Sequence, residues 1–303
     1  MSHISVLLHE TVDALVADRN TGIFVDGTFG RGGHTRLLLS KLDEHAQVYA
    51  FDKDPQALAV AAELEKEDPR FKIIHASFAD LKEELEARNI GLVDGVMADL
   101  GVSSPQLDQA QRGFSFMHDG PLDMRMDNSK GQTAAEWLLD IEEEALANYI
   151  YQYGEERYSR RIAKAIKAAG HIQTTGQLAE IVKVAHPKWE KNKHPATRTF
   201  QAIRIAINKE LEDIEDFLPQ AVDVLKPEGR LAVISFHSLE DRLIKQFIQK
   251  ESTLGEDMSW GMPQKQEDTR RLKKISRVKA SEEEVKANPR SRSAWLRVAA
   301  RIA

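Results

Sequence analysis

The sequence has no cysteine among its 303 residues. This absence excludes disulfides, thiolate zinc sites, cysteine-ligated iron–sulfur clusters and any cysteine nucleophile. Long apolar runs are also lacking, since spanning a bilayer takes ~20 apolar residues in a row. The N-terminal stretch MSHISVLLHE shows neither the basic nor the apolar region of a signal peptide. These absences predict a cytoplasmic protein with no membrane partner.

Positive charge is in short supply, because 48 Asp and Glu outnumber 42 Lys and Arg and give a net charge of −6. This balance excludes a globally basic nucleic-acid coat protein but leaves room for a local basic face. The ten histidines include no H-E-x-x-H motif, and no tight carboxylate cluster is visible. The sequence therefore predicts no metal site.

The first hundred residues alternate between strand-like and helix-like segments. Strands are predicted at 22–26, 47–52, 71–75 and 92–100, with helices at 35–42, 55–65 and 81–88. The next strand, 231–236, follows a turn at 226–229. About 130 residues separate it from the fourth strand, whereas a βαβ unit needs only about 30. The predicted fold class is α/β, a parallel sheet covered on both faces, with an inserted subdomain.

The surplus residues have helical patterns. Thr133–Glu136 and Thr174–Gln177 match the capping box, and residues 156–169 place apolar side chains on one face and basic ones on the other. A further long pattern opens at Pro195 and runs through Leu211. We expect three parts: residues 1–112 as the first part of the main domain, 113–203 as a helical insertion, and 204–303 as the second part with a basic C-terminal segment.

A glycine-rich segment, Asp26 to His34 (DGTFGRGGH), lies between the first strand and its helix. A Walker A loop needs a lysine after its last glycine, but Gly32 is followed by Gly33. The dinucleotide form G-x-G-x-x-G fails too, because Gly30-x-Gly32 leads to Thr35. The remaining D-x-x-x-G-x-G pattern is similar to S-adenosylmethionine sites, where glycines admit the ligand and the helix start can receive its carboxylate.

Two further residues fit the same ligand. Asp52 ends the second strand, 20 residues beyond Gly32, where an acid can accept both ribose hydroxyls. Phe78 follows the third strand and can lie against an adenine, although a core phenylalanine fits its position equally well. An ordinary glycine turn with a strand-end acid is the alternative; the combination favours a cofactor site.

The segment Asp99 to Gln106 (DLGVSSPQ) follows the fourth strand. Ligands of open α/β sheets bind at the carboxyl ends of the strands, so this is the expected substrate edge. A Ser-Pro turn that merely leaves the sheet is the alternative. After the fifth strand, Ser235, His237 and Asp241 could form a hydrolase triad, but no G-x-S-x-G elbow supports one.

Basic residues gather in two regions, and phosphate contacts from Lys and Arg supply most sequence-independent affinity for nucleic acid. Solvated charged faces are the alternative. The RNA-binding candidates are Arg160, Arg161, Lys164, Lys193 and Arg198 in the insertion, and Arg270, Arg271 and Lys274 near the C-terminus.

Several long blocks of the sequence together resemble the bacterial ribosomal RNA small-subunit methyltransferase H family. The blocks are Asp26 to His34, Asp99 to Gln106, Arg112 to Phe116, Asp119 to Met126, Tyr153 to Arg157, His194 to Phe200 and Ser235 to Arg242. The resemblance extends from about His9 to Arg292, nearly the whole chain, and blocks of this length are highly specific.

The resemblance implies a class I (Rossmann-like) methyltransferase with a helical insertion. It implies S-adenosylmethionine-dependent N4-methylation of cytidine 1402 of 16S rRNA, in the decoding centre of the small ribosomal subunit. Matched motif by motif, the implied cofactor-binding residues are Gly32, Gly33, His34, Asp52, Phe78, Asp99 and Gln106.

The expected catalytic loop is Ser103-Ser104-Pro105. It departs from the (Asp/Asn/Ser)-Pro-Pro-(Tyr/Phe) loop of most amino-methyltransferases, since Gln106 replaces the aromatic residue. Phe114, Phe116 and Trp189 are the candidates for stacking on the target base. Methylation at carbon 5 of cytosine normally needs a cysteine thiolate, which this chain lacks, so the exocyclic N4 is the expected acceptor.

Two other classes of function stay open at this point. One is a methyltransferase acting on a small molecule or a protein, with the insertion as a lid. The other is a non-catalytic RNA-binding module. The sequence leaves open the oligomeric state (a homodimer included) and the identity of any general base.

Overall fold

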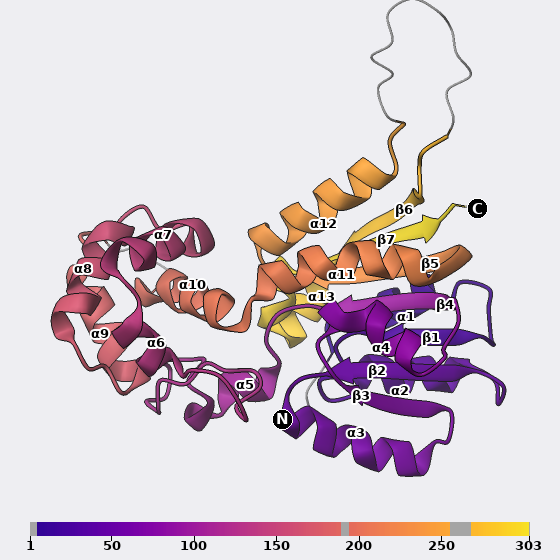
Figure 1. The fold of residues 1–303 in the computed structure, drawn as a ribbon, viewed down its shortest axis with the longest axis horizontal. Coiled ribbons are helices and arrows are strands. Elements are labelled where there is room, and N and C mark those ends of the chain that lie inside the picture. The colour runs from indigo at the N-terminus through magenta and orange to yellow at the C-terminus, as the bar shows by residue number, and fades with distance from the viewer. Residues whose placement is uncertain (1–4, 189–193, 255–267, 303) are drawn as a thin grey trace, which may run out of the picture. The chain divides into compact units, whose positions relative to one another are not determined.

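The computed structural model describes residues 5–188, 194–254 and 268–302. The chain divides into two compact units (Figure 1): unit 1 comprises residues 1–101 and 212–303, and unit 2 comprises residues 102–211. Unit 2 is wider at both ends than the 113–203 expected from the sequence.

Unit 1 is built on a seven-stranded sheet of order β3-β2-β1-β4-β5-β7-β6. The first five strands run parallel, and β7 pairs antiparallel with both β5 and β6. The strands are β1 (Ile23–Asp26), β2 (Gln47–Asp52), β3 (Phe71–His75), β4 (Val93–Asp99), β5 (Leu225–Ser235), β6 (Leu272–Lys279) and β7 (Trp295–Arg301). The predicted parallel sheet is confirmed, and β6 and β7 extend it beyond the prediction.

Helices lie on both faces of this sheet. Leu296 and Val298 of β7 join the core cluster formed with α1 and α2, whereas Arg297, which points to the opposite face, bonds Asp241 of α12. The helices of unit 1 are α1 (Leu8–Val16), α2 (Gly33–Lys41), α3 (Pro55–Glu67), α4 (Leu81–Ala87), α11 (Glu210–Val224), α12 (Ser238–Glu251) and α13 (Glu282–Ala287), with short 3₁₀ turns η1 (Phe78–Asp80) and η3 (Pro289–Ser293).

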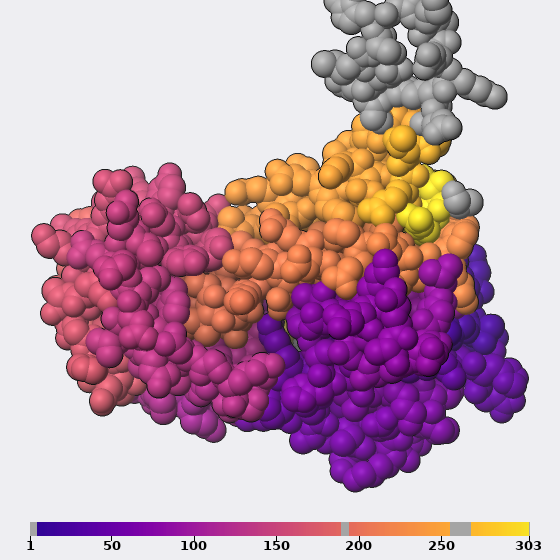
Figure 2. All heavy atoms as spheres, in the orientation of Figure 1, coloured from indigo at the N-terminus to yellow at the C-terminus, as the bar shows by residue number. Residues whose placement is uncertain are grey.

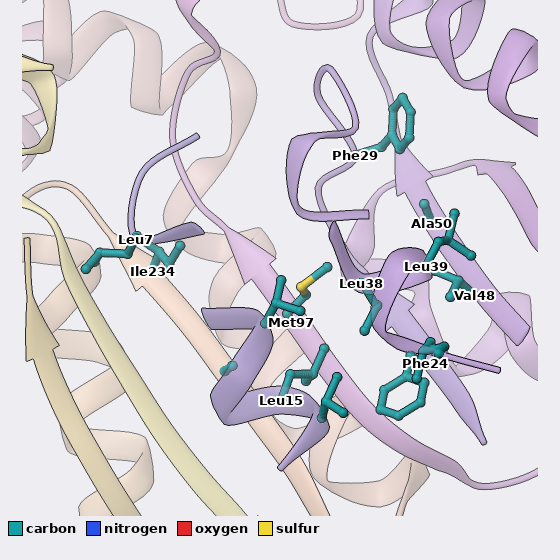
Figure 3. Packing of buried hydrophobic residues seen from close by; sticks show 14 of the residues in the cluster. Leu7, Leu15, Phe24, Phe29, Leu38, Leu39, Val48, Ala50, Met97 and Ile234 are labelled. Carbon is teal, nitrogen blue, oxygen red and sulfur yellow. The ribbon is translucent and has the colours of Figure 1, made fainter. Parts of the chain in front are cut away.

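The core of unit 1 joins segments that are far apart in the sequence. In Figure 3 the side chains of Leu15 from α1, Phe24 from β1, Leu38 from α2 and Met97 from β4 gather in one cluster. All four are at most 1% exposed. The C-terminal part of unit 1, orange to yellow, lies against the indigo and purple N-terminal part (Figure 2), so both parts form one body.

Residues 226–229, expected as a turn before the strand, lie within the bounds of β5 but pair with no residue of β4. Leu225 pairs with Val93 and Arg230 with Gly95, and Glu228 between them has a left-handed backbone (φ 62°). One expectation about this region was wrong. The long helical pattern from Pro195 through Leu211 is broken at Lys209, whose left-handed backbone (φ 54°) ends α10 before α11 begins.

Unit 2 is helical. Its elements are α5 (Ser104–Asp108), η2 (Ala110–Arg112), α6 (Ala134–Asp140), α7 (Glu143–Gly154), α8 (Ser159–Ala169), α9 (Thr175–Ala185) and α10 (Ala196–Asn208). Both predicted capping boxes are present, at Thr133 for α6 and at Thr174 for α9. The core of unit 2 includes Leu146, Ile150, Ile162 and Phe200, which come from α7, α8 and α10.

Candidate functional site

The predicted cofactor residues of unit 1 lie at the carboxyl ends of four neighbouring strands. Asp26 ends β1, Asp52 ends β2 and Asp99 ends β4, while Phe78 follows β3. The strand order β3-β2-β1-β4 therefore brings these segments to one edge of the sheet. Binding sites of open α/β sheets form at this edge.

Hydrogen bonds fix the glycine-rich loop to both adjacent strands. The N–H of Gly27 donates to the carbonyl of Met97 in β4 at 2.8 Å, and the N–H of Phe29 donates to the carbonyl of Phe51 in β2 at 2.9 Å. The N–H of Asp99 donates to Thr28 Oγ1 at 2.6 Å. The loop backbone is therefore ordered from both sides.

Asp26 anchors the start of the glycine-rich loop through two hydrogen bonds. Its carboxylate accepts the N–H of Thr28 at 3.0 Å and the hydroxyl of Thr35 at 2.7 Å, and the residue is only 2% exposed. Burial raises the pKa of Asp26 to about 6, while its hydrogen bonds from Thr35 and Thr28 act in the opposite direction. The first residue of the D-x-x-x-G-x-G pattern is thus a structural anchor, a role that the sequence pattern alone did not assign.

The glycines are required by close approaches. A Cβ atom at Gly27 would lie 3.2 Å from Phe78 Cβ, and one at Gly33 would lie 2.0 Å from Ser5 Oγ. Gly32 has a left-handed backbone (φ 77°), and a Cβ atom there would lie 2.7 Å from the ring of Phe29. Side chains at these positions would displace the loop.

Asp52 faces the loop across the strand ends. Its Oδ2 accepts the N–H of Gly30 at 2.8 Å, and its Oδ1 accepts the N–H of Asp54 at 2.9 Å. Burial raises the pKa of Asp52, and these two N–H groups oppose that effect. Because a carboxylate oxygen can accept more than one hydrogen bond, Asp52 retains capacity for ligand hydroxyls.

Asp99 and His34 form a second polar group at this edge. His34 is 6% exposed; its Nε2 donates to the carbonyl of Val6 at 3.1 Å, and its Nδ1 lies 3.8 Å from Asp99 Oδ2. Asp99 Oδ1 is buried and accepts no hydrogen bond from the described residues. Burial, and then the charges of Asp26 and Glu240, raise the pKa of Asp99 well above its ordinary value. The Asp99 side chain is 27% exposed, so a cationic ligand group beside it would compensate the charge of the carboxylate.

Phe78 is half-buried in η1, and its ring meets the ring of Phe217 in α11 edge-on, with centroids 5.1 Å apart at 82°. The side chain is thus held from one side by an aromatic contact. Partial exposure leaves part of the ring accessible to a ligand.

The Ser103-Ser104-Pro105 segment and Gln106 belong to unit 2, directly after Gly101 and Val102 in the chain. Ser103 precedes α5, and its N–H donates to Gln106 Oε1 at 2.9 Å. The carbonyls of Ser103 and Pro105 accept N–H groups of Leu107 and Gln109 at 3.3 and 3.0 Å. The Ser104 hydroxyl makes no hydrogen bond to any residue in the described ranges.

The aromatic candidates and the possible triad differ in how far they are buried and in which residues they contact. Phe114 is core, with 5% exposure, whereas Phe116 is half-buried and its ring lies 4.6 Å from that of His194. Trp189 and Lys193 lie outside the described residues. Asp241 is bonded to Arg297 at 2.7 Å and Glu240 is the acid within 3.1 Å of His237, an arrangement that does not form a hydrolase triad.

The two basic regions differ in how their charges are compensated. Arg160, Arg161 and Lys164 are exposed on α8 and have no ion pair or hydrogen bond within the described part of the chain. Arg270 is paired with Asp268 at 2.6 Å, Arg271 with Asp223 at 2.8 Å, and Lys274 with Gln249. Arg198 in α10 lies 3.8 Å from the buried carboxylate of Glu156.

Comparison with known proteins decides the family. A family model described as the MraW methylase family matches residues 1–302. The chain belongs to this family. It is 83% identical over 302 residues to "Ribosomal RNA small subunit methyltransferase H" of Acinetobacter baylyi, with all of both chains covered. It is 54% identical over 308 residues to the protein of the same name from Psychrobacter sp., covering 99% of this chain and 91% of that one.

The resemblance inferred from the motif blocks is therefore confirmed by the family model and the relatives, and the predicted α/β fold is confirmed by the seven-stranded sheet of unit 1. A solved rRNA methylase structure from Streptococcus thermophilus is 13% identical, with a TM-score of 0.46 and complete coverage of both chains. Among the described helices, none combines the length and apolar composition that a membrane crossing requires.

Proposed function

We propose that this methylase transfers a methyl group from S-adenosylmethionine to N4 of cytidine 1402 in 16S rRNA of the small ribosomal subunit. The observation that supports the rRNA substrate most strongly is the 83% identity, over the full length of both chains, to a relative named as a small-subunit rRNA methyltransferase. The cytidine position is proposed from the motif resemblance alone, and the N4 chemistry from the resemblance and the absence of cysteine.

The residues at the strand edge fit S-adenosylmethionine. Asp52 would accept the ribose hydroxyls, and the half-buried ring of Phe78 would lie against the adenine. Glycine at positions 32 and 33 would keep the loop backbone in place, because a Cβ atom at either position would clash with Phe29 or Ser5. The Asp99 carboxylate, whose side chain is 27% exposed, would accept the cationic amino group. When bound, the cofactor supplies an electrophilic methyl group on a sulfonium.

The absence of cysteine favours N4 over carbon 5, because no thiolate is available to add at carbon 6 of the ring. The N4 lone pair is delocalised into the ring, so an acceptor for the N4 hydrogens would help the nitrogen towards tetrahedral geometry. The Ser104 hydroxyl is the best candidate acceptor, since the carbonyls of Ser103 and Pro105 already serve α5. Gln106 would combine its bond to Ser103 with its implied role at the cofactor.

RNA binding is assigned first to α8, whose three exposed cations have no partner in the described ranges of the chain. Among the residues that the structure describes, Phe116 is the better candidate for stacking on a base, because Phe114 is buried in the core. A target base has to leave its stack, at a cost of a few kcal/mol. An aromatic ring and a set of free cations are the usual means of holding such an RNA segment.

The test is methyl transfer from tritiated S-adenosylmethionine to small ribosomal subunits prepared from cells that lack this enzyme. Subunits from cells that contain it serve as the control, because their acceptor is already methylated. We expect label in 16S rRNA, and mass spectrometry of digested RNA should place N4-methylcytidine in the fragment with nucleotide 1402. A methyl group on carbon 5 or on the 2′-hydroxyl would overturn the chemistry. Label only in protein or metabolite fractions would overturn the substrate, and binding without turnover would indicate a non-catalytic module.

A further inference from the structure

One carboxylate of α11 joins two segments of the candidate cofactor site. Asp213 Oδ2 accepts hydrogen bonds from Lys53 Nζ at 2.9 Å and from Ser77 Oγ at 3.0 Å. The side chains of Asp213 and Lys53 are 16% and 24% exposed. Limited exposure shields this ion pair from solvent and distinguishes it from ordinary surface pairs.

The two donors are immediate neighbours of two proposed cofactor residues. Lys53 follows Asp52, the proposed ribose acid, and Ser77 precedes Phe78, the proposed adenine contact. Ser77 Oγ also accepts the N–H of Ala79 at 3.2 Å, which begins η1. A single carboxylate oxygen therefore joins the segments that follow β2 and β3 at this edge, where the strands themselves are already paired through Asp52 and His75.

The same helix also holds the ring of Phe78. Phe217 lies one turn beyond Asp213 on α11, is fully buried, and contacts Phe78 edge-on. Asp213 thus fixes the backbone before Phe78 while Phe217 fixes its ring. The two contacts together determine where the aromatic face lies relative to Asp52.

We propose that Asp213 is a positioning residue for the adenosine half of the cofactor. It does not touch the ligand; it holds Asp52 and Phe78 at the separation that ribose and adenine require. This inference rests on the proposed function, because it presupposes that S-adenosylmethionine binds at this edge. A preformed separation avoids the cost of ordering these side chains at the moment of binding.

The helix itself does not depend on Asp213. Ile214, Phe217, Leu218, Ala221 and Val222 are each at most 2% exposed and pack α11 into unit 1. Gln220 makes a separate tie to the neighbouring segment, donating to the carbonyl of Ala79 and accepting the N–H of Lys82 at 2.9 Å. These bonds involve neither Lys53 nor Ser77, so Gln220→Ala is a matched control on the same helix.

The experiment is calorimetric titration of S-adenosylhomocysteine into the full-length protein and its Asp213→Ala, Asp213→Asn and Gln220→Ala variants. We expect Asp213→Ala to raise Kd about tenfold, or 1.4 kcal/mol. Asp213→Asn keeps an acceptor for Ser77 but loses the charge that holds Lys53. Its Kd should therefore lie between that of the unmodified protein and that of Asp213→Ala. Gln220→Ala should stay within about twofold of the parent, the scatter expected of a near-neutral change.

Kinetics and a second pair of variants separate positioning from general stability. With RNA substrate, Asp213→Ala should raise KM for S-adenosylmethionine and leave kcat at saturation nearly unchanged. The double variant Lys53→Met with Asp213→Asn should weaken binding no more than the stronger of its two single changes, because each single change removes the same Lys53–Asp213 ion pair. Equal losses in Asp213→Ala and Gln220→Ala, or unchanged affinity in Asp213→Ala, would overturn the positioning role. Failure of the parent protein to bind S-adenosylhomocysteine would instead overturn the proposed cofactor.

Discussion

The strand edge of unit 1 and the α8 surface of unit 2 differ in whether their charged side chains have hydrogen-bond partners within the protein. At the strand edge, Asp26 and Asp52 each accept two hydrogen bonds from the surrounding backbone and side chains. On α8, Arg160, Arg161 and Lys164 have no partner within the described residues. The difference matches the ligands proposed for each region, since a small cofactor needs fixed acceptors, whereas an RNA backbone needs cations that can adapt to it.

A second basic region shows that the presence of cations is not sufficient. Arg270 and Arg271 are already paired with carboxylates, and Asp268 beside Arg270 has its pKa lowered to about 2. A phosphate would have to compete with these acids. The RNA-binding role that the sequence suggested equally for both regions is therefore expected mainly of α8.

The largest effect should come from reversing charge on α8. Changing Arg160, Arg161 and Lys164 together to Glu should weaken binding to small ribosomal subunits by about 10²–10³-fold at moderate salt, because attraction to several phosphates is replaced by repulsion. The slope of log K against log salt should fall by roughly 0.7–0.9 for each phosphate that the variant no longer neutralises. Filter binding over a salt series measures both quantities.

The control for this change is the same reversal at Arg270, Arg271 and Lys274. These residues already have partners, so the variant should lose less affinity and change the salt slope less. If the second triple variant loses as much as the first, ion pairing on the protein does not distinguish the two regions. If neither loses affinity, both are merely solvated faces.

The buried carboxyl group of Asp26 should make the stability of the protein depend on pH. Asp26 has a pKa of 3.8 in an unfolded chain and about 6 in the folded one, so the folded protein holds this proton more tightly. The free energy of unfolding should therefore fall as pH rises from about 4 to about 6, by roughly 3 kcal/mol at most. Asp26→Asn should remove the share of this fall that Asp26 contributes and leave the shares of Asp52 and Asp99, whose pKa values are also raised, as measured by urea unfolding at a series of pH values.

Asp68 offers a control of opposite sign. Hydrogen bonding from Arg70 lowers the pKa of Asp68, so its contribution is present above the unfolded pKa and is lost as pH falls. Asp68→Asn should thus reduce stability near neutral pH and leave the fall between pH 4 and 6 intact. An unchanged pH profile in Asp26→Asn would show that another buried group, such as Asp99, controls it.

The catalytic hypothesis depends on a hydroxyl that the fold leaves available. Ser104→Ala should lower turnover by about 10²-fold, the typical effect of one well-placed polar group on a transition state. S-adenosylhomocysteine affinity should stay unchanged, since the strand edge is untouched. Ser103→Ala is the structural comparison, because Ser103 begins α5. Full turnover in Ser104→Ala would leave the backbone carbonyls as the remaining acceptors.

The sequence predicted the parts of the fold that local patterns determine. Strands β1 to β4 and the capping boxes at Thr133 and Thr174 were found within a residue or two, because apolar runs and helix starts have local signals. Strand β6 was interpreted only as a basic tail. Most of its residues are exposed, so no apolar pattern marks it, and its structure comes from pairing with β7.

The site was predictable where motifs are contiguous and not where contacts are distant. Asp52 and Asp99 follow strands that the sequence shows, so their common edge could be inferred. Asp213 lies 160 residues from Lys53, and no local pattern connects them. The partners of Arg271 likewise depend on tertiary structure, because Asp223 and Glu251 lie 48 and 20 residues away in the sequence. Charge in a sequence shows where cations are, but only the fold shows whether they are already used.

The smallest expected change concerns the ribose acid itself and tests whether the strand edge binds a cofactor at all. Asp52→Ala should weaken S-adenosylhomocysteine binding by roughly 1.5–3 kcal/mol, the value of hydrogen bonds to a charged group. Asp52→Asn retains an acceptor oxygen and should lose less. Asp54→Ala is the matched control: it removes the side chain that accepts the N–H of Gln56 at the start of α3. That change should cost about 0.5–2 kcal/mol of stability and little affinity. If Asp54→Ala weakens binding as much as Asp52→Ala in folded protein, the effect belongs to the β2–α3 connection as a whole, and Asp52 has no specific role at the ribose.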